Sequence, residues 1–175
     1  MRFLGYVLLV VLFIFATLFI VGLCLPRVRK GTKQTVYNAS IETVYNASIE
    51  TVYNTVVNNK DWKWRTSLDN LQIIETNDDF EVWEEISQGS MIRFKTKEKT
   101  PFSFYSFEMN NKFFQGEWFA EFESVENGKT RFIATELIIY KNPLIRVLGY
   151  AFMDLDGFMG TYQNELKNKL ENASR

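Results

Sequence analysis

The sequence predicts an α+β protein, in which an antiparallel β-sheet wraps around a long C-terminal helix and one transmembrane helix precedes the folded domain. Three observations support this prediction. Residues 1–25 are almost entirely apolar, apolar residues alternate with polar ones through residues 71–140, and residues 142–172 carry apolar residues at helical spacing. A sheet with one apolar face needs a second layer to cover it, so the helix is expected to pack on the sheet.

Residues 1–25 are interpreted as a membrane anchor. Phe3–Leu25 contains no charged residue, and a helix of that length, at about 1.5 Å per residue, crosses the apolar core of a bilayer. A cleaved signal peptide is the alternative. However, the apolar run is longer than in most signal peptides, and no small-x-small cleavage site follows it. Leu23 precedes Cys24, where a bacterial lipid-attachment site would have a small residue.

The charges around the apolar run predict its orientation. Basic residues follow the run at Arg27, Arg29, Lys30 and Lys33. Only Arg2 and the amino terminus precede it, so the positive-inside rule predicts a single-pass protein with its C-terminal domain in the cytoplasm. Residues 26–32 are expected to form a basic linker, and residues 33–175 one domain with its own core.

Composition excludes several kinds of site. The formal net charge is −1, so a nucleic-acid partner is not expected. The chain has no histidine, which removes imidazole bases, Ser–His and Cys–His pairs and most zinc sites. Cys24 is the only cysteine, so there is no intrachain disulfide and no thiolate metal cluster. We therefore predict no metal, no cofactor and no identifiable catalytic residue, while the oligomeric state is left open.

An exact repeat lies near the start of the domain, at residues 35–50. The octad TVYNASIE occupies Thr35–Glu42 and again Thr43–Glu50, and Thr51–Asn54 begins a third copy. A tandem duplication is the simplest explanation, and an insertion of even length preserves which side chains of a strand face inward. The first copy and the start of the second are expected to be an extended strand. Three N-x-S/T sequons, at Asn38, Asn46 and Asn172, are accidental if the domain faces the cytoplasm.

The end of the second octad is expected to begin a short helix. Ser48 is a suitable N-cap, and Glu50 lies in the first turn, where a negative charge is favourable. The apolar residues of one helical face would be Ile49, Val52, Tyr53 and Val56. Asn58–Asp61 should end the helix, ahead of Trp62 and Trp64.

The alternating region predicts six strands in a continuous meander. Their expected bounds are Leu71–Thr76, Phe80–Ser87, Ser90–Glu98, Phe102–Met109, Phe113–Val125 and Lys129–Tyr140. Short turn signals separate them at Asn77-Asp78-Asp79, Gln88-Gly89, Thr100-Pro101, Asn110-Asn111 and Asn127-Gly128. Connections this short favour antiparallel neighbours throughout.

Two-residue turns would fix the strand registers. A turn at Gln88-Gly89 pairs Trp83 with Phe94 on the inner face and Glu84 with Arg93 outside, and it turns Glu85 inward. A turn at Asn110-Asn111 pairs Phe107 with Phe114 and Tyr105 with Gly116. A turn at Asn127-Gly128 pairs Phe122 with Ile133, Ala120 with Thr135 and Trp118 with Leu137. The outer face would then carry four acidic residues, Glu117, Glu121, Glu123 and Glu136.

Residues 142–172 are predicted to form one long helix. Asn142 is a good N-cap, and Pro143 suits the first helical position. Its apolar stripe would be Leu144, Leu148, Ala151, Leu155, Phe158, Tyr162, Leu166 and Leu170. Asp154 and Asp156 are two positions apart and therefore face different ways, so they are interpreted as solvated residues rather than a catalytic pair.

The order of strand, short helix, Trp-rich turn, meander and long helix resembles the START-like helix-grip superfamily. This group is also called the SRPBCC, or polyketide cyclase/dehydrase and lipid-transport, superfamily. The segments that carry the resemblance are Tyr45–Tyr53, Trp62 with Trp64, Gly116-Glu117-Trp118 and Gly128-Lys129-Thr130-Arg131. The duplicated octad and the close spacing of the two tryptophans depart from the family pattern. The resemblance covers residues 33–171 and implies no transferable catalytic residue.

The resemblance implies a pocket between the sheet and the C-terminal helix. Its expected walls are Trp83, Phe94, Tyr105, Phe107, Trp118, Phe122, Leu148, Phe152, Leu155 and Met159, with Glu85, Tyr105 and Thr135 as polar groups. The leading hypothesis is a membrane-tethered domain that binds a lipid or another hydrophobic small molecule without catalysis. The alternatives are a cyclase- or dehydratase-like enzyme that uses Glu85, Tyr105 or an aspartate, and an interaction module whose interior is filled.

Overall fold

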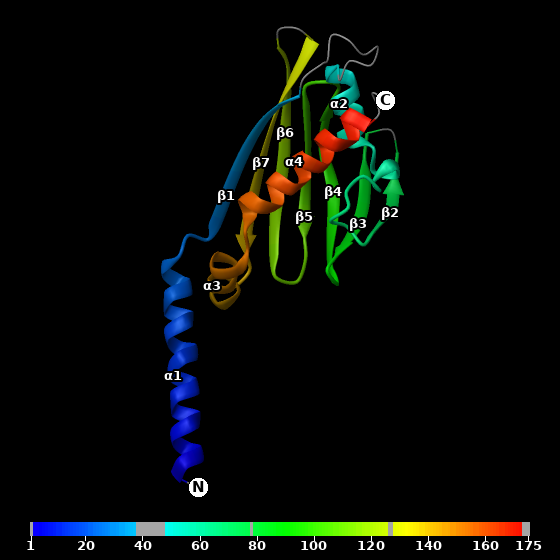
Figure 1. Ribbon diagram of the computed structural model, residues 1–175. Coiled ribbons are helices and arrows are strands. Elements are labelled where there is room, and N and C mark those ends of the chain that lie inside the picture. Colours follow the sequence, from blue (N-terminus) through cyan, green and yellow to red (C-terminus); the bar gives the residue numbers. More distant parts are fainter. Residues whose placement is uncertain (1, 38–47, 78, 126–127, 173–175) are drawn as a thin grey trace.

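The computed structural model describes residues 2–37, 48–77, 79–125 and 128–172. Figure 1 shows a sheet, with α4 crossing one of its faces and α1 projecting from one end of the domain. In chain order the elements are α1 (Arg2–Cys24), β1 (Val28–Tyr37), α2 (Ile49–Val57), the 3-10 helix η1 (Asn59–Asp61), β2 (Asn70–Thr76), β3 (Glu81–Ser87), β4 (Ser90–Thr100), β5 (Phe104–Asn110), β6 (Phe114–Val125), β7 (Lys129–Tyr140), α3 (Pro143–Phe152) and α4 (Leu155–Asn172).

The sheet is antiparallel, with strand order β1-β7-β6-β5-β4-β3-β2. Strands β2 to β7 follow one another as a meander, and β1 pairs with the far edge at β7. The face that α2 and α4 cover is called the inner face below (Figure 1). The predicted α+β helix-grip architecture is therefore confirmed.

β1 begins at Val28, inside the segment expected to be a linker. Val28 pairs with Ile139, and the pairing continues to Tyr37 opposite Thr130. The backbone of this segment is extended because it completes the sheet beyond β7. Gly31 permits the close approach of α4, since a Cβ at Gly31 would lie 3.0 Å from the Met159 sulfur. The strand predicted for the first octad and the start of the second is described only as far as Tyr37. The rest of that prediction falls on residues 38–47, which lie outside the described residues.

α2 matches its prediction. The Ser48 side chain accepts a hydrogen bond from the Thr51 backbone N–H at 3.2 Å, so it caps the helix. Val52, Tyr53 and Val56 are buried, and Ile49 packs partly against the core. Tyr53 makes an edge contact with Phe122, with the ring centroids 5.2 Å apart. The helical period of the apolar residues therefore predicted correctly which side of α2 packs on the core.

The three predicted registers have different outcomes. At Gln88-Gly89 the prediction is confirmed, because Trp83 pairs with Phe94 and Glu84 with Arg93. Both turn residues have positive φ, 49° at Gln88 and 73° at Gly89, which is typical of a two-residue type I′ turn. The Arg93–Glu84 ion pair, at 3.3 Å, lies on the outer face as expected.

The β5–β6 register differs from the prediction by an even number of residues. Phe107 pairs with Trp118 and Tyr105 with Ala120, rather than with Phe114 and Gly116. The Asn111 side chain accepts hydrogen bonds from the backbone N–H groups of Phe113 and Phe114, and this side-chain turn lengthens the connection. Because the shift is even, the inner and outer faces remain as predicted.

The β6–β7 register differs by one residue, and this changes which residues of β7 face inward. Trp118 pairs with Glu136, Ala120 with Ala134 and Phe122 with Phe132. Val125 pairs with Lys129, where the predicted two-residue turn would have paired Glu126 with Lys129, and Gly128 has a φ of 67°. A three-residue hairpin loop ends in such a left-handed residue. Glu136 therefore lies on the inner face, and its predicted outer position is wrong, as are the inner positions of Ile133, Thr135 and Leu137.

The predicted C-terminal helix is two helices, broken at Met153-Asp154. Asn142 caps α3 as expected, accepting a hydrogen bond from the Ile145 N–H at 2.8 Å. Asp154 then accepts a hydrogen bond from the Gly157 N–H at 2.9 Å, so it caps α4 as a new N-terminus. The predicted apolar stripe is divided accordingly: Leu155, Leu166 and Leu170 are buried under α4, whereas Leu148 on α3 is exposed.

Candidate ligand-binding site

Aromatic side chains form a continuous layer over the inner face of the sheet. Trp83 stacks on Phe94, with centroids 5.2 Å apart, and Phe107 stacks on Trp118 at 4.9 Å. Edge contacts join the two stacks, including Trp83 with Phe107 at 5.2 Å. These side chains come from β3, β4, β5 and β6, whose alternation directs every second residue to this face.

Tyr162 of α4 covers part of this layer. Its ring centroid lies 6.1 Å from that of Trp118 and 5.5 Å from that of Trp64. The backbone of α4 approaches the sheet most closely at β1, so aromatic side chains occupy the space between α4 and the central strands. This arrangement places Tyr162 between the sheet layer and the Trp-rich segment after η1.

Most of the predicted wall residues lie in this interior. Those that are buried are Trp83, Phe94, Tyr105, Trp118, Phe122, Leu155 and Met159, and Phe107 is half-buried. Leu148 and Phe152 are 50% and 82% exposed on α3, so their predicted interior positions are wrong. They were predicted inward because one uninterrupted helix would have continued the α4 stripe through them. Thr135, predicted as a polar group of the pocket, faces outward and bonds the Thr32 hydroxyl instead, at 3.1 Å.

A charged pair lies at one end of the aromatic layer. The Arg65 guanidinium donates to the Glu85 carboxylate at 2.6 Å, and the two side chains are 13% and 12% exposed. The Trp83 indole N–H donates to the same carboxylate oxygen at 2.9 Å. The inward position of Glu85, which the β3–β4 register predicts, is therefore confirmed. Its charge is neutralised by Arg65, a residue that the sequence analysis did not place in the site.

Two buried hydroxyls lie near this pair. Tyr105 is 2% and Thr96 is 4% exposed, and neither hydroxyl makes a well-formed hydrogen bond with any residue that the structure describes. The second guanidinium nitrogen of Arg65 also has no partner among these residues. Burial raises the pKa of Tyr105 well above its ordinary value, and the neighbouring Thr96 hydroxyl and Arg65 charge act in the opposite direction. Buried polar atoms are normally satisfied, so these three atoms mark the polar end of the candidate site.

Glu136 supplies a carboxyl group to the other side of the aromatic layer. It pairs with Trp118 on β6 and with Gly31 on β1, and Met159 and Leu155 of α4 lie over Gly31. Burial raises the pKa of Glu136 from 4.5 to about 7. The predicted turn was one residue too short, so the predicted register placed Glu136 on the outer face. Gly128 was the signal that could have found this residue, because glycine suits the left-handed residue that ends a three-residue hairpin loop.

An open hollow of about 610 Å³ also lies on the outer face of the sheet. Charged side chains of both signs line it, including Arg93, Lys97 and Glu117. Lys97 and Glu117 form an ion pair at 2.7 Å, and Arg93 pairs with Glu84. Because these charges neutralise one another and the hollow is open to water, we place the candidate site on the inner face.

Comparison with known proteins supports the same architecture. No protein-family model and no curated protein matches the chain. Among solved structures, the Zhui aromatase/cyclase from Streptomyces sp. R1128 matches with a TM-score of 0.69 at 8% identity, over 85% of this chain and 96% of that chain. A START superfamily protein from Mycobacterium smegmatis matches with a TM-score of 0.59 at 13% identity, over 82% and 98% of the two chains.

A norcoclaurine synthase gives a third match. Norcoclaurine synthase from Thalictrum flavum, solved in complex with dopamine and hydroxybenzaldehyde, has a TM-score of 0.62 at 6% identity, over 83% of this chain and 87% of that chain. Identities this low establish a shared fold and leave the activity open. The folded part of this chain therefore has the helix-grip architecture of START-like proteins and aromatase/cyclases.

Proposed function

We propose that this protein binds a hydrophobic small molecule between the inner face of its sheet and α4. The observation that carries the proposal is a group of three polar atoms, Tyr105 Oη, Thr96 Oγ1 and Arg65 Nη2. They are buried beside an aromatic layer and make no well-formed hydrogen bond with the residues that the structure describes. Aromatic walls favour an apolar or aromatic guest, and a few convergent polar groups fix its orientation. The guest would carry an oxygen that accepts from Tyr105 or Arg65.

We also propose that α1 tethers this site to a membrane. Phe3–Cys24 is apolar and long enough to cross a bilayer, and nearly all of it is exposed. The same properties suit a signal sequence, but the contacts of α1 with α3 support a retained helix. A C-terminal reporter fusion would test the orientation, with a cytoplasmic signal expected from the basic residues after the span. A tethered site would draw its guest from the membrane.

Native mass spectrometry of the full chain tests the binding proposal. Protein extracted from its host membranes in mild detergent should retain a hydrophobic small molecule after the detergent is removed. The double variant Thr96→Val/Tyr105→Phe should lower the retained fraction about tenfold, because it removes hydrogen bonds worth about 1.4 kcal/mol in total. Tyr150→Phe, a hydroxyl deletion on α3, is the matched control and should retain the molecule as the wild type does.

Retention that is the same in the double variant and the wild type would contradict the proposed orientation of the guest. A chain that retains nothing, even after incubation with a lipid extract of the host, would contradict binding itself. That result would favour the alternative function, an interaction module whose interior is filled by its own aromatic side chains.

Glu136 favours a second candidate function, in which the site catalyses a cyclisation or dehydration. A general acid or base works best with a pKa near the working pH, and the pKa of Glu136 is about 7. Glu85, another acid that the sequence offers for this role, is paired with Arg65 and is less suited to it. Glu136→Gln should abolish the loss of water from a polyketide-type substrate followed by chromatography and mass spectrometry. Unchanged turnover in that variant would contradict this role.

A further inference from the structure

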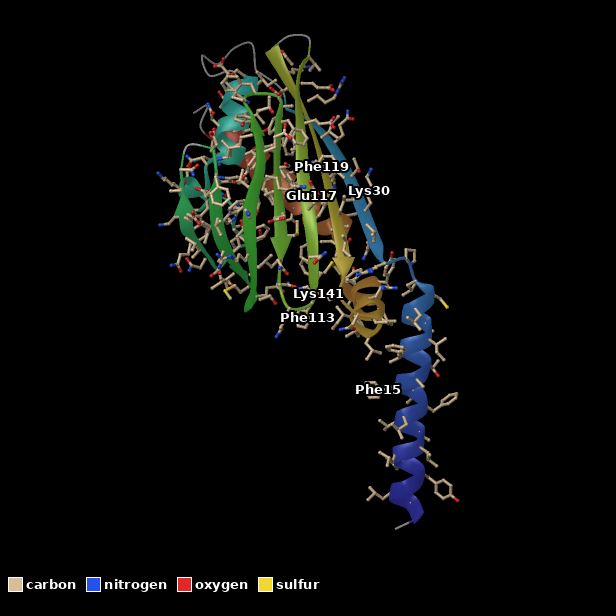
Figure 2. The ribbon with its side chains drawn as sticks, turned by 180° about the vertical axis from the view of Figure 1, so that it is seen from behind. Phe15, Lys30, Phe113, Glu117, Phe119 and Lys141 are labelled. Atoms are coloured by element: carbon tan, nitrogen blue, oxygen red, sulfur yellow. The ribbon has the colours of Figure 1, made fainter. Side chains whose placement is uncertain are left out.

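The end of the domain that α1 joins (Figure 1) carries an exposed apolar surface. Phe152 and Leu148 of α3 are 82% and 50% exposed, and Ala151 between them is also exposed. Positions three and four apart share one side of a helix, so these residues form a single outward face. In Figure 2, Phe113 of the β5–β6 connection lies at the same end of the domain, and its side chain is 39% exposed. We call Leu148, Ala151, Phe152 and Phe113 the basal surface.

α3 is fixed at the level of the last turn of α1. The Arg146 guanidinium donates to the backbone carbonyls of Gly22 and Leu25, at 2.8 and 2.9 Å. Gly22 is buried against the start of α3, since a Cβ there would lie 2.1 Å from the Pro143 carbonyl oxygen. At about 1.5 Å per residue, Gly22 is only about 3 Å along the axis from Cys24, where the apolar helix ends.

A second arginine holds the other end of α3. The Arg29 guanidinium donates to the carbonyls of Gly149 and Met153, at 3.1 and 2.8 Å. Gly149 lies in the last turn of α3 and Met153 is its C-cap residue, whose backbone N–H also donates to the Gly149 carbonyl, at 3.0 Å. Arg29 and Arg146 together give α3 a fixed position beside α1, with its outward face left uncovered by the described residues.

Basic side chains border the basal surface. Lys112 Nζ lies 4.7 Å from the centroid of the Phe113 ring, Lys141 donates to Asn110 Oδ1 at 2.7 Å, and Arg27 is exposed at the junction of α1 and β1. The carboxylate of the nearby Asp154 is engaged in capping α4. Apolar side chains beside exposed cations are the pattern by which interfacial helices bind anionic lipid.

We propose that α3 is an interfacial helix, and that the basal surface rests on the anionic surface of the bilayer that α1 enters. The inference depends on the proposed insertion of α1 and adds to it a fixed orientation of the domain. Leu148, Phe152 and Phe113 enter the boundary between headgroups and acyl chains, and Lys112, Lys141 and Arg27 meet the lipid phosphates. The domain stands on this base instead of moving freely on a tether.

Depth-dependent quenching tests the proposal in the full chain. Cys24 is the only cysteine, so Cys24→Ser gives a background for single-cysteine labelling with an environment-sensitive fluorophore. The fluorophore is attached at Ala151→Cys on α3, at Phe13→Cys in α1 and at Glu121→Cys on β6. The protein is reconstituted in vesicles of phosphatidylcholine and phosphatidylglycerol with brominated acyl chains.

The α3 probe should show roughly half of the quenching of the α1 probe, because interfacial helices lie about 5–10 Å into the boundary region. The Glu121 probe should show almost none, since that residue lies about 23 Å along β6 from Phe114 at about 3.3 Å per residue. Leu148→Ser/Phe152→Ser should reduce quenching at Ala151→Cys severalfold, whereas Ile74→Ser, at an exposed residue of β2, should not.

Each other result overturns the inference in a distinguishable way. Strong quenching in α1 with none at α3 would leave the tether intact and exclude the interfacial helix. Absence of quenching at both positions would exclude the tether as well. An α3 probe that is shielded from aqueous iodide but not quenched by brominated lipid would show that a second copy of the chain covers the basal surface.

Discussion

Glu136 and Glu85 are two carboxyl groups of the same interior with opposite electrostatic situations. Glu85 accepts hydrogen bonds from the Arg65 guanidinium and the Trp83 indole. Glu136 lies beside Trp118 and Gly31, and burial raises its pKa to about 7. The first group is paired with a guanidinium, whereas the second is mostly protonated below pH 7 because burial disfavours its charged form. We therefore expect Glu85 and Glu136 to respond differently to pH and to mutation.

Glu136 should make the protein less stable as the pH rises from about 4.5 to about 7. The folded state binds the proton more tightly than the unfolded state, so stability is fully present below the unfolded pKa and is lost as pH rises through the folded pKa. The loss should be about 2–3 kcal/mol. Denaturant unfolding of the full chain in detergent micelles measures it. Glu136→Gln should remove most of this dependence and should be the more stable protein at pH 8; an unchanged profile would contradict the shift.

Removal of Glu85 should be strongly destabilising. Glu85→Ala leaves the Arg65 guanidinium and the Trp83 indole N–H buried without a partner, at an expected cost of about 3–5 kcal/mol. Arg65→Met/Glu85→Ala should recover most of that loss, because no unpaired charge remains. Glu84→Ala, on the same strand as Glu85, removes the ion pair with Arg93 on the outer face and should cost less than about 1 kcal/mol. Equal losses in the two single variants, measured by denaturant unfolding, would contradict the proposed burial of the Arg65–Glu85 pair.

At the scale of elements, the break between α3 and α4 separates two tasks. α4 buries Leu155, Leu166 and Leu170 against the sheet and α2, whereas α3 packs against the end of α1. The break occurs because Asp154 caps a new helix and the Met153 backbone is extended, with a ψ of 116°. A single helix could not have covered the sheet and reached α1 in these directions.

Two glycines of these helices should respond differently to alanine. A Cβ at Gly149 would lie 2.2 Å from the Tyr140 ring, which is buried, so Gly149→Ala should destabilise the protein by about 1–3 kcal/mol through overpacking. A Cβ at Gly160 would lie 2.6 Å from Lys33 Nζ, the end of a flexible side chain. Gly160→Ala should therefore be neutral or stabilising by up to about 1 kcal/mol. Thermal unfolding of both variants checks this, and the opposite order would contradict the packing of α3 on β7.

Element positions were predictable wherever a local signal decided them. Ser48 and Asn142 were identified as caps, and positive φ at Gln88 and Gly89 agrees with the turn that fixed the β3–β4 register. The β6–β7 register was not predictable in this way, because Asn127-Gly128 suits both a two-residue and a three-residue loop. That difference of one residue moved Glu136 from water to the interior.

At the scale of the molecule, the inner wall was largely predictable and the ends of the site were not. Period-two alternation identified the buried aromatic residues of β3 to β6, such as Trp83 and Trp118, because it depends only on residue type. Arg65 comes from an irregular segment, whose position follows from tertiary packing. Leu148 and Phe152 share the helical period of the core helix, so the sequence does not distinguish an apolar face that covers a sheet from one that lies on a membrane.

The central claim is that a guest molecule binds under α4, beside the buried Tyr105 and Thr96 hydroxyls and the aromatic layer of the inner face. A crystal structure of the full chain purified from its host membranes tests it most directly. The account predicts electron density for a hydrophobic molecule against the Trp118 and Tyr162 rings, with one polar atom within hydrogen-bond distance of Tyr105 Oη or Thr96 Oγ1. Side chains that fill this space, with the two hydroxyls bonded to each other or to water, would contradict it.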